Sequence, residues 1–323
     1  MARYVVGVDL GGTNIKAGCL DDEAQVLSHL SITTEARSGP DAVMDRIAQA
    51  AWQAVQQAGL SVVDVLAVGV GAPGTIDFDT GVVTIAPNLP GWNDVPLRQG
   101  VADRLEAATV IENDANAAAY GEYWAGAGAQ ADPMVLLTLG TGIGGGIIIG
   151  GQLLHGASGA GAELGHMVIR FGGRRCGCGN QGCLEAYASA TGLVARFKEA
   201  AEAGAEGTLA ARARRGTEVT SEGIYQEAVA GDKLCRKMME ETGVLLGYGI
   251  TSIVHALNPQ RVVLSGGMIG AGEMLMEPAC RTVAEMAFPL SQKPLEIVFA
   301  QLGGDAGFIG AAGCALRSSE TSA

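Results

Sequence analysis

Three cysteines within eight residues, Cys176, Cys178 and Cys183, follow a histidine, His166, that lies ten residues before the first of them. Three thiols and one imidazole make a complete tetrahedral ligand set for zinc, and the intervening glycines let the backbone wrap closely around a metal ion. This spacing favours zinc over two alternatives, a loop of reduced thiols and a disulfide. The segment therefore predicts a built metal site.

Two turns rich in glycine and threonine are candidates for phosphate binding. Residues 11–13 (Gly-Gly-Thr) and 140–145 (Gly-Thr-Gly-Ile-Gly-Gly) each join two short apolar strands. Consecutive backbone N–H groups in such turns form an anion-binding nest, and glycine permits the close approach of a phosphate. A single turn would be no more than a tight β-hairpin, but two matched copies favour phosphate binding.

The second turn also fits the pattern G-x-G-x-x-G. A dinucleotide site requires a helix directly after that loop, so that its N-terminus faces the pyrophosphate. Residues 146–150 (Gly-Ile-Ile-Ile-Gly) follow instead and predict a strand, which excludes a Rossmann site. The chain contains no G-x-x-x-x-G-K-[ST] sequence either, which excludes a P-loop enzyme.

Two aspartates lie where strands end. Asp9 closes the first strand beside the first turn, where a carboxylate suits water-mediated binding of Mg²⁺, although it could simply cap the turn. Asp114 follows a strand at 109–112 and precedes a helix, a position at which ligands gather in α/β sheets. It could accept a proton from an alcohol during phosphoryl transfer, and Asn113 could hold a neighbouring hydroxyl. The alternative is helix capping by Asp114 or Asn116.

The elements that would position these residues occur twice in the same order. Each copy has a strand, a glycine-rich turn, a second strand and, further on, a strand that ends in glycines; the later strands are 65–71 and 261–265. Helical spacing of apolar residues predicts helices between them. The predicted helices are 40–57, 116–125, 221–230, 232–257 and a last one at the C-terminus. Alternating strands and helices predict an α/β fold.

The composition limits the class of protein. A chain of 323 residues with 48% hydrophobic and 17% charged residues predicts a well-packed globule of two domains. The net charge of −13 argues against a nucleic-acid or anionic-membrane partner. The uncharged stretch 133–162 is too rich in glycine for a membrane helix. The N-terminus lacks a signal-peptide pattern, and the remaining cysteines stand singly in apolar segments, so a reducing cytoplasm is expected.

Three segments together resemble the ROK sugar kinases, which belong to the actin-like, ribonuclease-H-like ATPases: residues 9–18, 139–146 and 176–185. Residues 86–92 (Ala-Pro-Asn-Leu-Pro-Gly-Trp) are similar to those of the bacterial ATP-dependent glucokinases in this family. The resemblance implies two duplicated α/β domains with a cleft between them. One domain would comprise 1–115 with the C-terminal helix 305–317, and the other 116–304 with the zinc site and the second phosphate loop. A homodimer is also implied.

The resemblance further implies roles for individual residues. Asp114 would be the catalytic base that deprotonates the 6-hydroxyl of the sugar. Asp9 stays the predicted Mg²⁺ residue from its position at the end of the first strand. The sugar would be bound by Asn88, Asn113, Asp114, Glu163, His166 and Glu185. The phosphates and adenosine of ATP would lie against Gly11, Gly12, Thr13, Lys16, Thr141, Gly142, Gly266 and Gly267. Zinc on His166, Cys176, Cys178 and Cys183 has no open position, so it would be structural and would position the sugar-binding loop.

The function predicted is therefore ATP- and Mg²⁺-dependent phosphorylation of glucose to glucose 6-phosphate, a step of glycolysis. Within the same class, N-acetylglucosamine, N-acetylmannosamine, mannose and fructose stay open as substrates. A sugar-sensing transcriptional repressor of the same family is disfavoured, because its helix-turn-helix domain would precede a strand that here begins by Tyr4. An actin- or chaperone-like ATPase switch is disfavoured because it would have no use for a zinc and sugar site.

Overall fold

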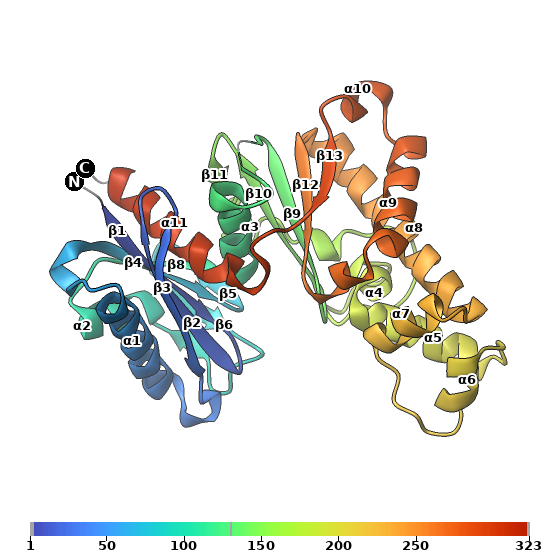
Figure 1. Cartoon of the computed structure of the whole chain (residues 1–323), viewed down its shortest axis with the longest axis horizontal. Helices are drawn as coiled ribbons and strands as arrows, with labels where there is room; N and C mark the ends of the chain where they lie inside the picture. The colour runs from blue at the N-terminus through green and yellow to red at the C-terminus, as the bar shows by residue number, and fades with distance from the viewer. Residues whose placement is uncertain (1–2, 130, 322–323) are drawn as a thin grey trace. The chain divides into compact units, whose positions relative to one another are not determined.

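A computed structural model describes residues 3–129 and 131–321 of the chain (Figure 1). Over these residues the strands are β1 (Tyr4–Leu10), β2 (Asn14–Asp21), β3 (Val26–Thr33), β4 (Val65–Ala72), β5 (Thr75–Asp77), β6 (Val82–Ile85), β7 (Asn93–Val95), β8 (Thr109–Asn113), β9 (Met134–Leu139), β10 (Ile143–Ile149), β11 (Gln152–Leu153), β12 (Arg261–Ser265) and β13 (Glu296–Phe299). The helices are α1 (Pro40–Gln57), α2 (Leu97–Leu105), α3 (Asp114–Ala125), α4 (Glu185–Ala188), α5 (Ala190–Glu202), α6 (Thr208–Ala213), α7 (Ser221–Val229), α8 (Lys233–Leu257), α9 (Glu273–Met286), α10 (Pro289–Gln292) and α11 (Ala306–Thr321). Short 3₁₀ turns cover Ala36–Ser38, Val62–Asp64, Leu164–His166, Gly267–Ala271 and Gly303–Asp305.

The chain divides into two compact units, which are described separately. Unit 1 comprises Met1–Ala131, Gly146–Ala162 and Ala300–Ala323, and unit 2 comprises Asp132–Gly145 and Glu163–Phe299. The C-terminal helix thus groups with the N-terminal segment. The boundaries 1–115, 305–317 and 116–304 stay a prediction.

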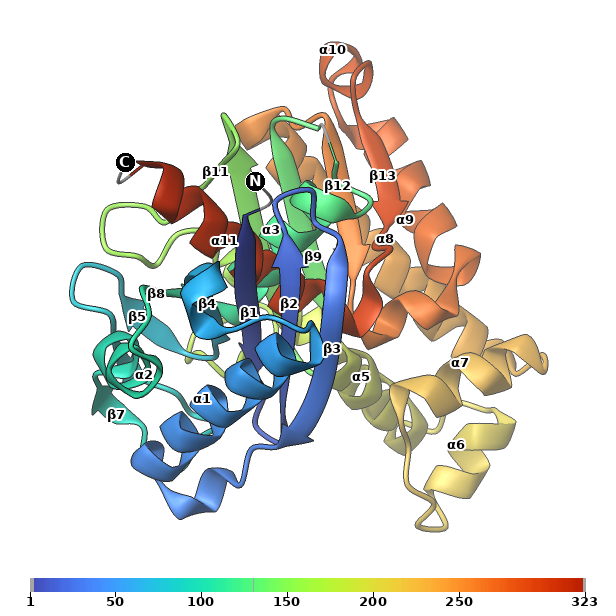
Figure 2. The same ribbon diagram turned by 60° about the vertical axis from the view of Figure 1, so that its left-hand side comes forward.

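Unit 1 is built on a five-stranded sheet of order β3-β2-β1-β4-β8. β1, β2 and β3 pair antiparallel, whereas β1, β4 and β8 run parallel. α1 lies across one face of this sheet (Figure 2). Its apolar residues Val43 and Ile47 are buried in one cluster with Val6 of β1. Phe308 of α11 is buried in another cluster with Val5. Because neighbouring residues of a strand point to opposite faces, the two helices cover opposite faces of this sheet.

Two glycines let α11 lie directly on the sheet. A Cβ atom at Gly7 of β1 would lie 1.7 Å from the carbonyl oxygen of Phe308, and one at Gly69 of β4 would lie 1.8 Å from that of Ala311. No other residue type fits at that separation. The first part of α11 is thereby held against the strand ends that carry Asp9.

Unit 2 contains the parallel strands β9, β12 and β13. The sheet to which they belong has the order β11-β10-β9-β12-β13, which repeats the plan of the first sheet: antiparallel hairpin strands, then parallel strands. α8, the longest helix of the described residues, packs on α9 through Gly243 against Pro278 and Gly247 against Thr282. The predicted α/β fold and its internal duplication are confirmed.

The long uncharged stretch forms strands rather than a helix. It forms β9, β10 and β11 with their turns. Within residues 3–129 and 131–321, no helix combines the length and the apolar character needed to cross a bilayer.

Candidate active site

Asp9 lies near the end of β1, at the centre of the unit 1 sheet. Its neighbour across the antiparallel pair is Lys16 of β2, and a Cβ atom at Gly307 of α11 would lie 2.7 Å from its carboxyl carbon. The pKa of the Asp9 carboxyl is raised to about 6: burial is the largest cause, the charge of Asp114 adds to the rise, and the charge of Lys16 opposes it. Two predicted site carboxylates of unit 1 are therefore close enough to repel each other.

Two carbonyl groups of the first glycine turn accept hydrogen bonds from Thr34, the residue that follows β3. Thr34, a fully buried residue, donates from its backbone N–H to the Thr13 carbonyl at 2.8 Å and from its hydroxyl to the Gly11 carbonyl at 2.6 Å. The Gly11 N–H donates to the Asn14 carbonyl at 3.0 Å. Among the described residues, the N–H groups of Gly12 and Thr13 donate no hydrogen bond, as an anion nest requires.

Lys16 contacts the segment that leads into α11. Its Nζ donates to the Gly304 carbonyl at 2.6 Å and lies 3.3 Å from a carboxylate oxygen of Asp305. If the Lys16 ammonium group binds a phosphate, it therefore either keeps its contact with Asp305 or gives that contact up.

Asp114 is the first residue of α3 and is exposed. The cap of that helix is Asn113, whose side-chain oxygen accepts from the N–H groups of Ala115 at 3.0 Å and Asn116 at 3.3 Å. Neither Asp114 nor Asn116 is therefore the N-cap, although one Asp114 oxygen also accepts from the Ala115 N–H at 2.9 Å. Because the Asn113 oxygen is committed to the cap, the group it can offer a hydroxyl is its amide NH₂, which also lies 3.3 Å from the Gly74 carbonyl.

Asn88 lies on an exposed loop that two buried side chains anchor. Leu89 and Trp92 are buried on either side of the turn, and the Trp92 N–H donates to the Leu89 carbonyl at 3.3 Å. The carbonyl oxygen of Asn88 lies 3.5 Å from the position of a Cβ atom at Gly12. The structure therefore brings the Asn88 loop beside the first glycine turn.

The second glycine turn belongs to unit 2 and is held in a different way. The Gly140 N–H donates to the Gly142 carbonyl at 3.0 Å, which closes the turn. The Thr191 hydroxyl donates to the Thr141 carbonyl at 2.7 Å, and the Ala190 N–H donates to the Gly140 carbonyl at 2.9 Å. Within the described chain, the N–H groups of Thr141 and Gly142 donate to no protein acceptor. This turn also has the features of a nest.

Glu185 connects the second turn with the cysteine cluster. One carboxylate oxygen accepts from the Ile143 N–H at 2.9 Å and would lie 2.3 Å from a Cβ atom at Gly142. The Cys176 thiol lies 3.5 Å from the other oxygen. A carboxylate predicted to bind sugar is thus also a support of the turn predicted to bind phosphate.

The four predicted zinc ligands come together. The Sγ atoms of Cys176, Cys178 and Cys183 and a ring nitrogen of His166 all lie within 4.8 Å of one another, and they form the one such group among the described residues. The Cys178 and Cys183 Sγ atoms are 3.8 Å apart, which is far longer than a disulfide of about 2.05 Å. It equals the separation of about 3.8 Å that tetrahedral zinc with Zn–S bonds of about 2.3 Å would impose. The donor set and its spacing therefore fit zinc.

His166 uses its two ring nitrogens differently. Nδ1 lies 3.7 Å from the Cys176 sulfur, and Nε2 lies 3.9 Å from a carboxylate oxygen of Glu163, an exposed residue. The Nε2 side of the ring is thus available beside Glu163 while Nδ1 faces the thiols.

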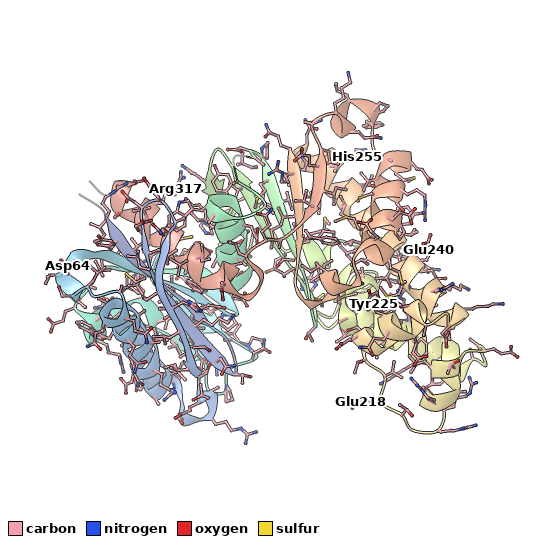
Figure 3. All side chains as sticks on the ribbon, in the orientation of Figure 1. Asp64, Glu218, Tyr225, Glu240, His255 and Arg317 are labelled. Carbon is pink, nitrogen blue, oxygen red and sulfur yellow. The ribbon has the colours of Figure 1, made fainter. Side chains whose placement is uncertain are left out.

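A cavity of about 240 Å³ opens beside the last predicted loop, Gly266 and Gly267. Gly266 has φ +90°, and a Cβ atom there would lie 2.5 Å from the Leu139 carbonyl at the end of β9, so this position requires glycine. Apolar walls and polar edges, as a purine base would need, are supplied by Leu193, Ser221, Tyr225, Gln226, Met239 and Met268. Tyr225 on α7 is labelled in Figure 3.

Comparison with known proteins identifies the family. A family model described as the ROK family matches residues 5–318. The chain belongs to the ROK family. A glucokinase of Halalkalibacterium halodurans is 38% identical over 95% of this chain and 93% of its own length.

Solved ROK structures have the same fold. The ROK hexokinase from Thermus thermophilus aligns with a TM-score of 0.85 and 34% identity over 98% of this chain and 99% of its own. A ROK family glucokinase from Streptomyces griseus, in complex with glucose and AMPPNP, aligns with a TM-score of 0.77 and 36% identity over 97% of this chain and 99% of its own. The predicted actin-like fold and the ROK resemblance are confirmed.

Sequence reasoning did not single out several residues that support these ROK motifs. Thr34 and Thr191 satisfy turn carbonyls, and Tyr225 lines the cavity, yet each is an ordinary residue within its own segment. Glu112, which is almost completely buried, is not among the predicted site residues either. A carboxylate at the end of an otherwise apolar strand was the available signal, because a buried charge needs partners.

Proposed function

We propose that the protein is an ATP-dependent hexose kinase that transfers the γ-phosphoryl group of ATP to the 6-hydroxyl of glucose. The observation that carries the proposal is the pair of carboxylates in unit 1. Asp114 stands exposed at the start of a capped helix, close enough to raise the pKa of the more buried Asp9. One carboxylate suits proton acceptance from an alcohol, and the other suits a cation, the two needs of phosphoryl transfer.

The ATP-binding part of the proposal uses both glycine turns. The unbonded N–H groups of Gly12, Thr13, Thr141 and Gly142 would bind phosphate oxygens, with Gly11 and Lys16 beside them. Mg²⁺ would be held through water by Asp9 and would neutralise charge on the phosphates. Adenosine would enter the cavity beside Gly266 and Gly267. The nucleotide analogue bound to the Streptomyces griseus relative supports ATP as the donor.

The sugar-binding part assigns the hydroxyls of the sugar to amide, carboxylate and imidazole side chains. Asn88, Asn113, Glu163, His166 and Glu185 would hold the hydroxyls, and Asp114 would deprotonate the one at carbon 6. Zinc on His166 and the three cysteines would fix the loop that carries these groups; the four ligand atoms within 4.8 Å of one another support this role. The names of the relatives, glucokinase and hexokinase, support glucose among the hexoses.

We further propose a cytoplasmic homodimer with no nucleic-acid partner and with the domain boundaries predicted above. The cytoplasm is supported by seven cysteines that are all free thiols in the structure. Multi-angle light scattering of the purified protein tests the dimer, and a monomer at micromolar concentration would contradict it.

The test of the function is ADP release with MgATP and a panel of sugars: glucose, mannose, fructose, N-acetylglucosamine and N-acetylmannosamine. We expect the highest kcat/KM with glucose. A higher value with another hexose would replace the substrate but keep the enzyme class. ATP hydrolysis independent of sugar, or tight sugar binding without turnover, would contradict the proposal and favour a switch or a sensor.

A further inference from the structure

Glu112, the last residue but one of β8, is a buried carboxylate that the proposed chemistry does not use. It is 4% exposed. Its Oε1 accepts from the backbone N–H of Asn113 at 2.9 Å and from the side-chain amide of Asn116 at 2.9 Å. The carboxylate therefore bonds to both sides of the junction at which β8 ends and α3 begins, and Asp114 lies in that junction.

The second oxygen of Glu112 has a partner from a distant part of the chain. Nε2 of His155, on the loop after β11, lies 2.8 Å from Oε2. The hydrogen bond to Glu112 raises the pKa of His155, which favours the charged pair. The ring of His155 rests on that of Phe78, with centroids 4.2 Å apart, and the His155 carbonyl accepts from the Gly161 N–H at 2.8 Å. Phe78 and Gly161 thus fix the position of His155, and His155 in turn bonds to Glu112.

An ion pair of this kind does little for stability on its own account. Burying two charged groups costs desolvation energy that their attraction offsets only when the geometry is good, and apolar residues of similar size often serve as well. Here the pair satisfies a carboxylate that already binds Asn113 and Asn116. Asn113 in turn caps α3, so Glu112 bonds to the residue that caps the helix beginning at Asp114.

We propose that Glu112 and His155 are positioning residues for phosphoryl transfer, which together hold the junction from which Asp114 accepts the sugar proton. The inference rests on the proposed role of Asp114. Neither residue contacts the reacting atoms, and both act through the Asn113–Asp114 peptide.

The test compares His155→Ala with His155→Gln, whose amide nitrogen can reach Glu112 as Nε2 does. We expect His155→Ala to lower kcat for glucose phosphorylation by about tenfold or more, with the KM for glucose within about twofold of wild type, since misplacement of a catalytic group costs rate rather than affinity. His155→Gln should recover most of the loss. His29→Ala is the matched control, because His29 also stacks on a phenylalanine of unit 1, Phe308, but has no bond to the junction.

Amide hydrogen exchange over residues 112–116 gives a second readout: exchange should quicken in His155→Ala, return towards wild type in His155→Gln and stay unchanged in His29→Ala. Thermal unfolding verifies that each variant is folded. Unchanged kcat in a folded His155→Ala variant would overturn this inference alone, and so would an equal loss in His155→Gln and His155→Ala. Wild-type protein without sugar-dependent ADP release would overturn the proposed function, and this inference with it.

Discussion

The two glycine turns have the same plan but different chemistry. In the first hairpin the residue two positions before the opening glycine is Asp9, and in the second it is Thr138. Asp9 is a carboxylate whose pKa is raised to about 6. The Thr138 hydroxyl instead accepts from the Gly144 N–H at 3.1 Å, within its own hairpin. At equivalent positions, unit 1 keeps a charge and unit 2 uses the side chain to brace the turn.

The residues that bond to the two turns also differ. Thr34 satisfies the first turn from the end of the adjacent strand, whereas the second is held by Thr191 and by Glu185, which also approaches the cysteine cluster. In the proposed function, a duplicated scaffold would thus carry the reacting carboxylates, Asp9 and Asp114, in unit 1. In unit 2 the scaffold carries the hydrogen bonds of Thr191 and Glu185 and the cysteine cluster, which we call the frame of unit 2. We therefore expect variants in unit 1 to lower kcat and variants in unit 2 to raise KM.

The largest expected effect is a loss of kcat on substitution of Asp114 in unit 1, which substitution of Glu185 in unit 2 should not cause. Asp114→Asn should lower kcat by about 10³-fold, because general-base catalysis contributes about 10²- to 10⁴-fold, while glucose affinity measured by calorimetry changes little. Glu185→Gln should mainly raise KM. A near-normal kcat in Asp114→Asn would remove Asp114 as the base, and a larger kcat loss in Glu185→Gln would reverse the comparison.

The equivalent positions of the hairpins give the second prediction. Asp9→Asn should lower kcat/KM for MgATP by about 10²-fold through the loss of a cation-binding charge. Thr138→Ala removes a neutral hydrogen bond, which is worth about 1 kcal/mol, and should cost less than about tenfold. Steady-state kinetics at varied Mg²⁺ measure both. Equal losses would mean that the two copies share one role.

Metal removal tests the frame of unit 2. Cys183→Ser should release zinc, lower the midpoint of thermal unfolding and raise the KM for glucose by about tenfold, since mutation of a group that orients a metal site costs about 10- to 100-fold. The control is Cys235→Ser, a buried thiol of α8 in the same unit and outside the cluster. Zinc content by atomic emission accompanies the kinetics. A Cys183→Ser protein that lacks zinc yet binds glucose normally would contradict the proposed role of the metal.

The raised pKa of Asp9 predicts that kcat/KM decreases at acid pH, which gives the pH–rate profile an acid limb. Because the cation needs the ionised carboxylate, kcat/KM for MgATP should fall as the pH drops through about 6, by about tenfold at pH 5. Higher Mg²⁺ should move the limb to lower pH, and Asp9→Asn should lose it. A limb that stays near pH 6 in Asp9→Asn belongs to another group.

The sequence predicted the elements better than the contacts that position the site. α1 spans residues 40–57 as predicted, because amphipathic periodicity is a local property. The predicted start of α3, residue 116, is two residues later than the observed start at Asp114, since the start depends on where the strand before it ends. The bond between Glu112 and His155 joins residues 43 apart and leaves no local signal. The cysteine and histidine ligands were recognisable because a metal requires a set of residue types that rarely occurs together.

The smallest expected effect is on stability, and its sign differs from that on activity. The folded-state pKa of Asp9, about 6, lies above its usual 3.8, so the carboxyl stabilises the fold when protonated, and this contribution is lost as the pH rises through 6. Asp9→Asn mimics the protonated state. Without Mg²⁺ or nucleotide, the variant should be more stable than wild type at pH 7.5 by about 2 kcal/mol, after a discount for partial exposure, or by about 2 to 4 °C.

At pH 4 the difference should nearly vanish, because Asp9 of the wild type is then protonated in the folded protein. Thr138→Ala, at the equivalent position of the second hairpin, should be less stable than wild type at both pH values, since it loses a hydrogen bond without removing a buried charge. Thermal unfolding of the three proteins at pH 4 and 7.5 measures this. A destabilised Asp9→Asn at neutral pH would show that the Asp9 charge stabilises the first hairpin, and the contrast between the two copies would then lie only in the bound ligand.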